Sequence, residues 1–188
     1  YRAHAVPVGV DQVPHVEMTR EIARRFNHLY GDVFPEPEAI LTPTPKILGM
    51  DRRKMSKSYN NAIYLSDSPE TVAHKVSQMV TDPNRMRRKD PGNPDICNVF
   101  TFHKLYSGEA VAADVDPKCR SAEIGCVECK KLMAEHLAAA MAPQYERRRH
   151  YEAHPEIVEE VIRSGSAKAR EVACETMAAV RDALKIKL

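Results

Sequence analysis

The sequence lacks long apolar runs, internal repeats and an excess of charge of one sign, and each absence excludes a class of protein. No apolar stretch approaches the length of a membrane-spanning helix, and no signal-peptide pattern is visible. The 28 basic and 26 acidic residues leave a formal net charge of only +2, which by itself does not indicate a nucleic-acid-binding protein. No repeat or low-complexity segment is present.

What the sequence contains is typical of a globular protein. Its 188 residues are enough for one large or two small domains, and a hydrophobic content of 43% is enough for a packed core. Local charge is more informative than net charge, because two basic clusters could contact phosphate: Arg85, Arg87, Arg88 and Lys89 in one segment, and Arg147, Arg148 and Arg149 in another. For the second cluster, a solvated charged helix face is an equally good interpretation.

A five-residue run, Lys54-Met55-Ser56-Lys57-Ser58, is the most informative feature. Two ammonium groups flank a small hydroxyl residue, and a second serine follows. Lysines on a mobile loop can bring point charges to a polyphosphate, and serines add hydrogen bonds to charge that develops as a phosphate bond breaks. The alternative is a solvated basic turn.

A second motif lies near the start, where residues 7–12 read Pro7-Val8-Gly9-Val10-Asp11-Gln12. The short apolar run before Gly9 predicts the end of a buried strand, and Gly9 allows close approach of the backbone to a ligand. Asp11 could accept hydrogen bonds from a ribose diol, although an aspartate after a glycine is most often a turn residue. A helical pattern follows from Pro14, so the segment predicts strand, turn and helix at the carboxyl edge of a parallel sheet.

Together these motifs resemble the tryptophanyl-tRNA synthetase family of the class I aminoacyl-tRNA synthetases, from Pro7 to about Leu184. The tyrosyl enzymes share the Gly-x-Asp-Gln turn and the lysine loop. The residues after Gln12, namely His15-Val16-Glu17-Met18-Thr19-Arg20 continuing into Arg24-Arg25-Phe26-Asn27, resemble the tryptophanyl enzymes, as does Thr81-Asp82-Pro83. The resemblance implies a cytoplasmic, homodimeric enzyme that activates L-tryptophan with ATP, releases pyrophosphate and charges tRNA(Trp).

The resemblance also implies roles for individual residues. Gly9, Val10 and Asp11 would hold the ribose side of ATP, and Gln12 would point toward the amino acid. Ile47 would line the adenine pocket. The catalytic residues would be Lys54, Ser56 and Lys57, which bind the triphosphate of magnesium-bound ATP, with Met55 and Ser58 completing the loop.

Two features of that family have no candidate in this sequence: the His-Ile-Gly-His type motif and the acidic residue that reads the indole nitrogen. The resemblance therefore implies a carboxy-terminal part of such an enzyme, which we expect to be inactive alone because catalysis needs all reacting groups in one frame. The alternative is a non-catalytic, metal-bearing, tRNA-binding helical module.

The expected fold is the α/β edge of a Rossmann-like nucleotide-binding domain over residues 1–66, followed by a mostly α-helical domain over residues 67–188. In the second domain, Ser68-Pro69-Glu70 predicts a helix start, and residues 83–95, with three prolines, predict a loop. Further helices are predicted over 96–106, over 123–152 with Pro143 as a candidate bend, and over 155–163 and 166–184 with a break near Gly165.

Four of the five cysteines form the pattern C-x21-C-x6-C-x2-C, through Cys97, Cys119, Cys126 and Cys129. Soft thiolates favour zinc or an iron–sulfur cluster, although zinc sites usually show two close cysteine pairs and here only one pair is close. Disulfides and unliganded buried thiols are the other interpretations. Some bacterial members of the family carry a 4Fe–4S cluster on a similar pattern, so the resemblance implies such a cluster, with zinc as the alternative. Cys174 is expected to be a core or half-buried thiol.

Overall fold

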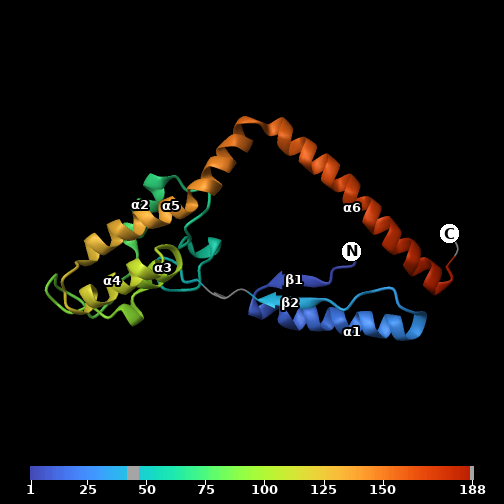
Figure 1. Cartoon of the computed structure of the whole chain (residues 1–188), viewed down its shortest axis with the longest axis horizontal. Coiled ribbons are helices and arrows are strands. Elements are labelled where there is room, and N and C mark those ends of the chain that lie inside the picture. The colour runs from blue at the N-terminus through green and yellow to red at the C-terminus, as the bar shows by residue number, and fades with distance from the viewer. Residues whose placement is uncertain (42–46, 187–188) are drawn as a thin grey trace. The chain divides into compact units, whose positions relative to one another are not determined.

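The computed structural model describes residues 1–41 and 47–186, and the chain divides into two compact units (Figure 1). One unit comprises residues 1–46 and 154–188, and the other comprises residues 47–153. Among the described residues, every helix is too short or too polar to span a lipid bilayer.

The amino-terminal segment is a β-α-β arrangement. Strand β1 (Ala5–Val8) leads through the 3-10 turn η1 (Val10–Gln12) into helix α1 (Val13–Tyr30), and β2 (Glu38–Leu41) follows. The two strands pair in parallel, with Ala5 opposite Glu38 and Val8 opposite Leu41. The predicted strand, turn and helix are therefore confirmed, and the turn lies at the carboxyl end of β1 (Figure 1). The strand was predicted to be buried, and this part is wrong, because the residues of β1 alternate between exposed and half-buried.

Local sequence signals explain where α1 begins and ends. Pro14 occupies the first turn, where its missing N–H costs nothing. Gly31 ends the helix with φ at 98°, a left-handed value that glycine adopts without strain. The side chain of Asn27 then holds the return of the chain: its Oδ1 accepts from the N–H groups of Val33 and Phe34, both at 3.0 Å.

Helix α6 runs unbroken from Pro155 to Leu184. The predicted break near Gly165 is wrong. A single glycine costs a helix only about 1 kcal/mol relative to alanine, and no proline accompanies it, so the flanking turns carry the helix through. Cys174 was predicted to be a core or half-buried thiol. This prediction is wrong, because Cys174 is exposed on α6.

The second unit is built from helices. It contains the 3-10 turn η2 (Lys57–Tyr59), helix α2 (Pro69–Gln78), the 3-10 turn η3 (Pro94–Ile96), and helices α3 (Asn98–Tyr106), α4 (Glu109–Arg120) and α5 (Cys126–Ala153). The core lies where α2 and α3 pack on α5, and its most deeply buried side chains include Val72, Val76, Met79, Val99, Phe102, Val115 and Met133.

Most predicted elements of this unit are present. Ser68 caps α2 by accepting the N–H of Thr71, and the predicted loop over 83–95 separates α2 from η3. Helix α5 continues through Pro143. The sequence analysis did not delimit α4. Residues 47–66 belong to this compact unit, while the assignment of 1–66 and 67–188 to two functional domains stays a prediction.

Candidate functional site

The lysine loop directly follows a tight hairpin formed by residues 48–54. Leu48 and Lys54 form an antiparallel bridge, and the N–H of Gly49 donates to the carbonyl of Arg53 at 2.8 Å. Arg52 closes the turn with φ at 68°. Gly49 is buried, and a Cβ there would collide with the side chain of Asn61. The hairpin therefore fixes the chain immediately before the two lysines.

The hairpin is anchored to the helices of its own unit. The carboxamide of Asn98, at the start of α3, donates to the carbonyl of Gly49 at 2.8 Å. The N–H of Val80, just after α2, donates to the carbonyl of Met50 at 2.9 Å. The base of the lysine loop is thus tied to two helix ends within residues 47–153.

A single carboxamide, that of Asn61, closes the loop from the other side. Its Oδ1 accepts the N–H of Ser56 at 2.9 Å, and its Nδ2 donates to the Lys54 carbonyl at 3.2 Å and to Asp51 Oδ1 at 2.7 Å. Asn61 is only 2% exposed. The hydrogen bond from Asn61, together with the neighbouring Arg53, lowers the pKa of Asp51 to about 2.

The two lysines lie outside this polar frame. Lys54 and Lys57 are exposed, and Ser56 caps the short η2 turn by accepting the N–H of Ser58 at 3.3 Å. Between the lysines, Met55 points the other way and packs against the core. The predicted catalytic set is therefore brought together on one loop, with an apolar anchor beneath and two ammonium groups in solvent.

Ile47 lies in apolar surroundings. It lines a hollow of about 150 Å³ together with Met55, Ile63, Phe102 and Met141, and it packs against the core. This position fits core packing, which the sequence alone allowed as well. A contact between Ile47 and adenine stays a prediction.

The Gly-Val-Asp-Gln turn lies in the other compact unit. The N–H of Gln12 donates to the carbonyl of Gly9 at 2.9 Å, so the chain reverses immediately after β1. A Cβ at Gly9 would lie 2.7 Å from Oδ1 of the exposed Asp11 side chain. The side chains of Asp11 and Gln12 are exposed and face one another at 3.4 Å. They could contact a ribose or an amino acid, but they hold no buried partner in the described residues.

The four predicted metal ligands come from three helices. Cys97 precedes α3, Cys119 lies in the last turn of α4, and Cys126 and Cys129 lie in the first turn of α5. All are free thiols, so the disulfide interpretation is not seen in the described residues. Over the same residues, no three Cys, His, Asp or Glu side chains lie close enough together to hold a single metal ion.

The cysteines are nevertheless close enough to influence one another electrostatically. Burial, and then the charges of Cys97, Cys119 and Cys126, raise the pKa of Cys129 to about 12. Burial also raises the pKa values of Cys97 and Cys119. These three thiols are therefore protonated at neutral pH unless a cation compensates for their burial.

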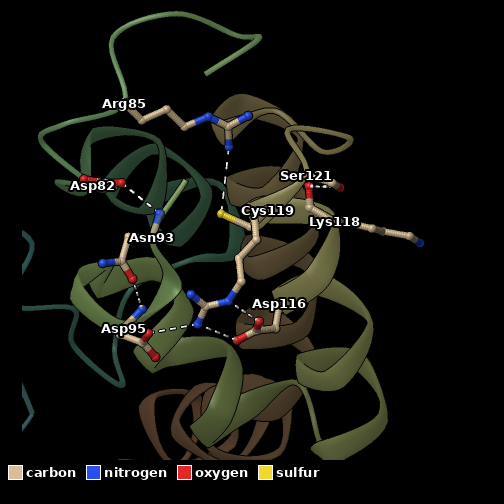
Figure 2. A network of polar contacts seen from close by, with 9 residues as sticks. Asp82, Arg85, Asn93, Asp95, Asp116, Lys118, Cys119 and Ser121 are labelled. Carbon is tan, nitrogen blue, oxygen red and sulfur yellow. Dashed lines mark hydrogen bonds and ion pairs between the residues drawn. The ribbon is translucent and has the colours of Figure 1, made fainter. Parts of the chain in front are cut away.

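Arg85 supplies such a positive charge next to the cysteines. Its Nη1 lies 3.9 Å from the sulfur of Cys119, as Figure 2 shows, and its charge opposes the rise in the pKa of Cys119. Its Nη2 donates to the carbonyl of Ile124 at 2.9 Å, which ties the loop after α2 to the α4–α5 connection. A Cβ at Gly92 would lie 2.5 Å from the Cys119 sulfur, so the glycine leaves room for that sulfur.

His103, which is fully buried, lies next to Cys129. Burial lowers the pKa of His103, so the ring is neutral. Its Nε2 lies 3.3 Å from the carbonyl oxygen of Cys129 and 3.4 Å from its sulfur, and its Nδ1 lies 2.8 Å from the Ser107 hydroxyl. Because a carbonyl only accepts, Nε2 carries the hydrogen and Nδ1 accepts from Ser107.

Four residues that shape these sites were not predicted from the sequence: Asp51, Asn61, Asn98 and His103. Arg85 was predicted only as part of a basic cluster that could contact phosphate, not as a neighbour of the cysteines. Asn61 follows the lysine loop closely, and Asn98 follows Cys97, so adjacency to a motif was the available signal. It was too weak to use, because an asparagine after a basic loop is most often a turn residue. Only the burial of the two asparagines distinguishes them.

Comparisons with known proteins agree on one family. Residues 1–142 match the family described as tRNA synthetases class I (W and Y). The chain is 51% identical over 187 residues to a tryptophan--tRNA ligase of Aquifex aeolicus, covering 99% of this chain and 47% of that protein. It is 50% identical over 187 residues to the corresponding ligase of Thermotoga maritima, covering 99% of this chain and 57% of that protein.

A solved structure gives the same result. The tryptophanyl-tRNA synthetase of Campylobacter jejuni, complexed with ADP and tryptophan, superposes with a TM-score of 0.80 at 30% identity, over 97% of this chain and 57% of that one. The chain spans about half the length of the curated relatives it matches. With its lysine loop, its strand–turn–helix segment and this family match over most of its length, the chain belongs to the class I tRNA synthetases of the tryptophanyl and tyrosyl family.

Proposed function

We propose that this chain supplies the lysine-loop side of the ATP site in a tryptophan--tRNA ligase. The observation that carries the proposal is the exposed pair Lys54 and Lys57 on a loop whose backbone is held by a buried carboxamide. The names of the relatives from Aquifex and Thermotoga favour tryptophan over tyrosine. None of the relatives named above is described as a non-catalytic binding module.

In this mechanism the loop stabilises charge. The tryptophan carboxylate attacks the α-phosphorus of magnesium-bound ATP, and pyrophosphate leaves. The ammonium groups of Lys54 and Lys57 neutralise the negative charge that builds on the leaving phosphates, and Ser56 and Ser58 add hydrogen bonds. No general base is needed, because a carboxylate is already a nucleophile. The loop also has to open to release pyrophosphate.

The turn after β1 has a different role in the proposal. The backbone of Gly9 and Val10 and the carboxylate of Asp11 hold the ribose, Gln12 faces the amino acid, and Ile47 contacts adenine. The support is the position of the turn at the carboxyl end of β1 in a parallel pair, where ligands of α/β sheets bind.

Lys57→Ala tests the role of the loop in the complete enzyme. Tryptophan-dependent exchange of pyrophosphate into ATP should fall by roughly 10²–10³-fold, the usual loss for one transition-state donor, while tryptophan binding changes little. Lys89→Ala is the matched control, because Lys89 is also an exposed lysine in a loop. Equal losses in tryptophan binding and in rate, or equal effects of the two substitutions, would contradict the proposal.

We also propose that Cys97, Cys119, Cys126 and Cys129 hold a 4Fe–4S cluster, with a structural zinc ion as the alternative. The donor chemistry fits, because four thiols act on one another beside the positive charge of Arg85. A cluster spans more space than one ion, so its four ligands need not meet at a point. When bound, such a cluster would cross-link three helix ends or take up an electron.

Iron analysis of protein purified without oxygen tests this proposal. About four irons and four acid-labile sulfides per chain are expected, with a brown colour. Cys129→Ser should abolish or weaken the colour. The matched Cys174→Ser should leave it intact, because Cys174 is exposed on α6. Colourless protein with one tightly held zinc would favour the alternative, and colourless metal-free protein would contradict both.

The remaining partners follow from the proposed ligase. tRNA(Trp) would meet basic surface of residues 67–188, and Arg87 and Lys131 line a hollow of about 460 Å³ there. A homodimer in the cytoplasm is the expected state of the complete enzyme.

A further inference from the structure

The lysine loop has to present two lysines in a defined geometry, although both lysine side chains are exposed. A pair of polar side chains beneath the loop supplies that geometry. Asn61 is nearly fully buried and bonds to the loop backbone on both sides of Met55, at the Lys54 carbonyl and the Ser56 N–H. Both lysines are thus within one residue of a backbone group that Asn61 holds.

Asp51 adds a third hydrogen bond that holds the carboxamide of Asn61 in the orientation the loop backbone requires. A carboxylate only accepts hydrogen bonds, so its contact at 2.7 Å requires the Nδ2 group of Asn61 on that side. The Oδ1 atom is then directed at the Ser56 N–H. Asp51 is fixed in turn by Arg53, whose backbone N–H and guanidinium donate to it at 3.0 and 2.6 Å.

We propose that Asp51 and Asn61 form a positioning pair that sets the backbone of the lysine loop so that Lys54 and Lys57 engage a polyphosphate together. The inference rests on the proposed role of the loop in binding ATP. Neither residue touches the polyphosphate, and both act through the backbone between Lys54 and Ser56.

The effect of charge and the effect of positioning have opposite signs at Asp51, which gives a sharp test. Asp51→Ala removes a negative charge near two lysines, and by electrostatics alone this should strengthen anion binding. If Asp51 positions Asn61, the same substitution removes the acceptor that holds Nδ2 of Asn61 and should weaken binding by about tenfold. The measurement is a titration of the isotopically labelled chain with inorganic tripolyphosphate, followed by NMR.

A second pair of variants distinguishes the effect of losing the Asn61 hydrogen bonds from the effect of adding a negative charge to the loop. Asn61→Asp and Asn60→Asp add the same charge one residue apart. Asn60 is exposed and has φ at 50°, a conformation that aspartate also adopts. Asn61→Asp should weaken tripolyphosphate binding about tenfold more than Asn60→Asp, because only Asn61 donates to Lys54 and Asp51. The amide signal of Ser56 should move in the Asn61 variant alone.

The outcomes are distinguishable. Unchanged or tighter binding by Asp51→Ala, or equal effects of the two asparagine variants, would overturn the positioning pair. If the unmodified chain and Lys57→Ala bind tripolyphosphate equally, the proposed role of the lysine loop fails, and the positioning pair fails with it. Signals of the buried Val76 and Met133 report in each variant that the helical core is intact.

Discussion

Residues 47–153 and residues 1–41 bury their apolar side chains to very different extents. In the first region, Val76 and Met133 are fully buried in a continuous core. In the second, Val16 and Ala23 are the buried hydrophobic residues, whereas Met18 and Ile22 on α1 are 62% and 64% exposed. Strand β2 likewise exposes Ile40 and Leu41.

This difference bears on the two predicted ATP-binding motifs. The lysine loop lies on a packed body, and buried side chains such as Asn61 and Asn98 fix its backbone. The Gly-Val-Asp-Gln turn is shaped by local chain geometry, with one backbone hydrogen bond and exposed side chains. Tertiary packing therefore fixes the backbone of the lysine loop. The backbone of the Gly-Val-Asp-Gln turn is instead fixed by the strand before it and the helix after it.

The largest expected effect comes from a matched pair of methionines. Met133→Ala should reduce the free energy of unfolding by about 2–5 kcal/mol, because it leaves a cavity in the core. Met18→Ala removes the same atoms from an exposed position on α1 and should change that free energy by no more than about 0.5 kcal/mol. Urea unfolding followed by circular dichroism measures both. Equal losses would show that residues 1–41 are packed as tightly as residues 47–153.

An intermediate effect is expected at Asn27, the residue that holds the return from α1 to β2. Asn27→Ala removes two hydrogen bonds from Val33 and Phe34 and one to the Phe34 carbonyl, and should cost about 1–3 kcal/mol. Asn27→Asp keeps the acceptor and should cost less. Hydrogen exchange at the Val33 and Phe34 amides reports the change. Exchange that stays as slow as in the unmodified chain would contradict this role.

The smallest expected effect concerns the pKa of Asp51 and the stability of the fold at low pH. Because the folded pKa of Asp51 is lowered to about 2 from an ordinary value of 3.8, its contribution to stability is present above pH 3.8 and is lost as the pH falls through about 2. Asn61→Ala removes the largest cause and should raise the pKa of Asp51 toward its ordinary value, whereas Asn60→Ala should leave it unchanged. Carboxyl-carbon NMR titration measures both. A pKa of Asp51 that stays near 2 without Asn61 would assign the shift to Arg53 instead.

Several local features could be predicted from the sequence because short-range physics decides them. Pro14 and Gly31 bound α1, Ser68 starts α2, and three prolines keep residues 83–95 out of α-helix. The helix break expected at Gly165 is absent because the local signal there is weak. A glycine is a weak local signal, and 30 residues of otherwise helical sequence outweigh it.

By itself, the sequence determined which residues are candidates for binding and catalysis: two lysines around a serine, a Gly-Val-Asp-Gln turn and four spaced cysteines. Only the tertiary structure decided that Asn61 and Asp51 lie beneath the lysine loop, and that Arg85 and His103 face different cysteines. The reason is sequence separation. Arg85 is 34 residues from Cys119, and His103 is 26 residues from Cys129, and such contacts depend on how the helices pack rather than on any local pattern.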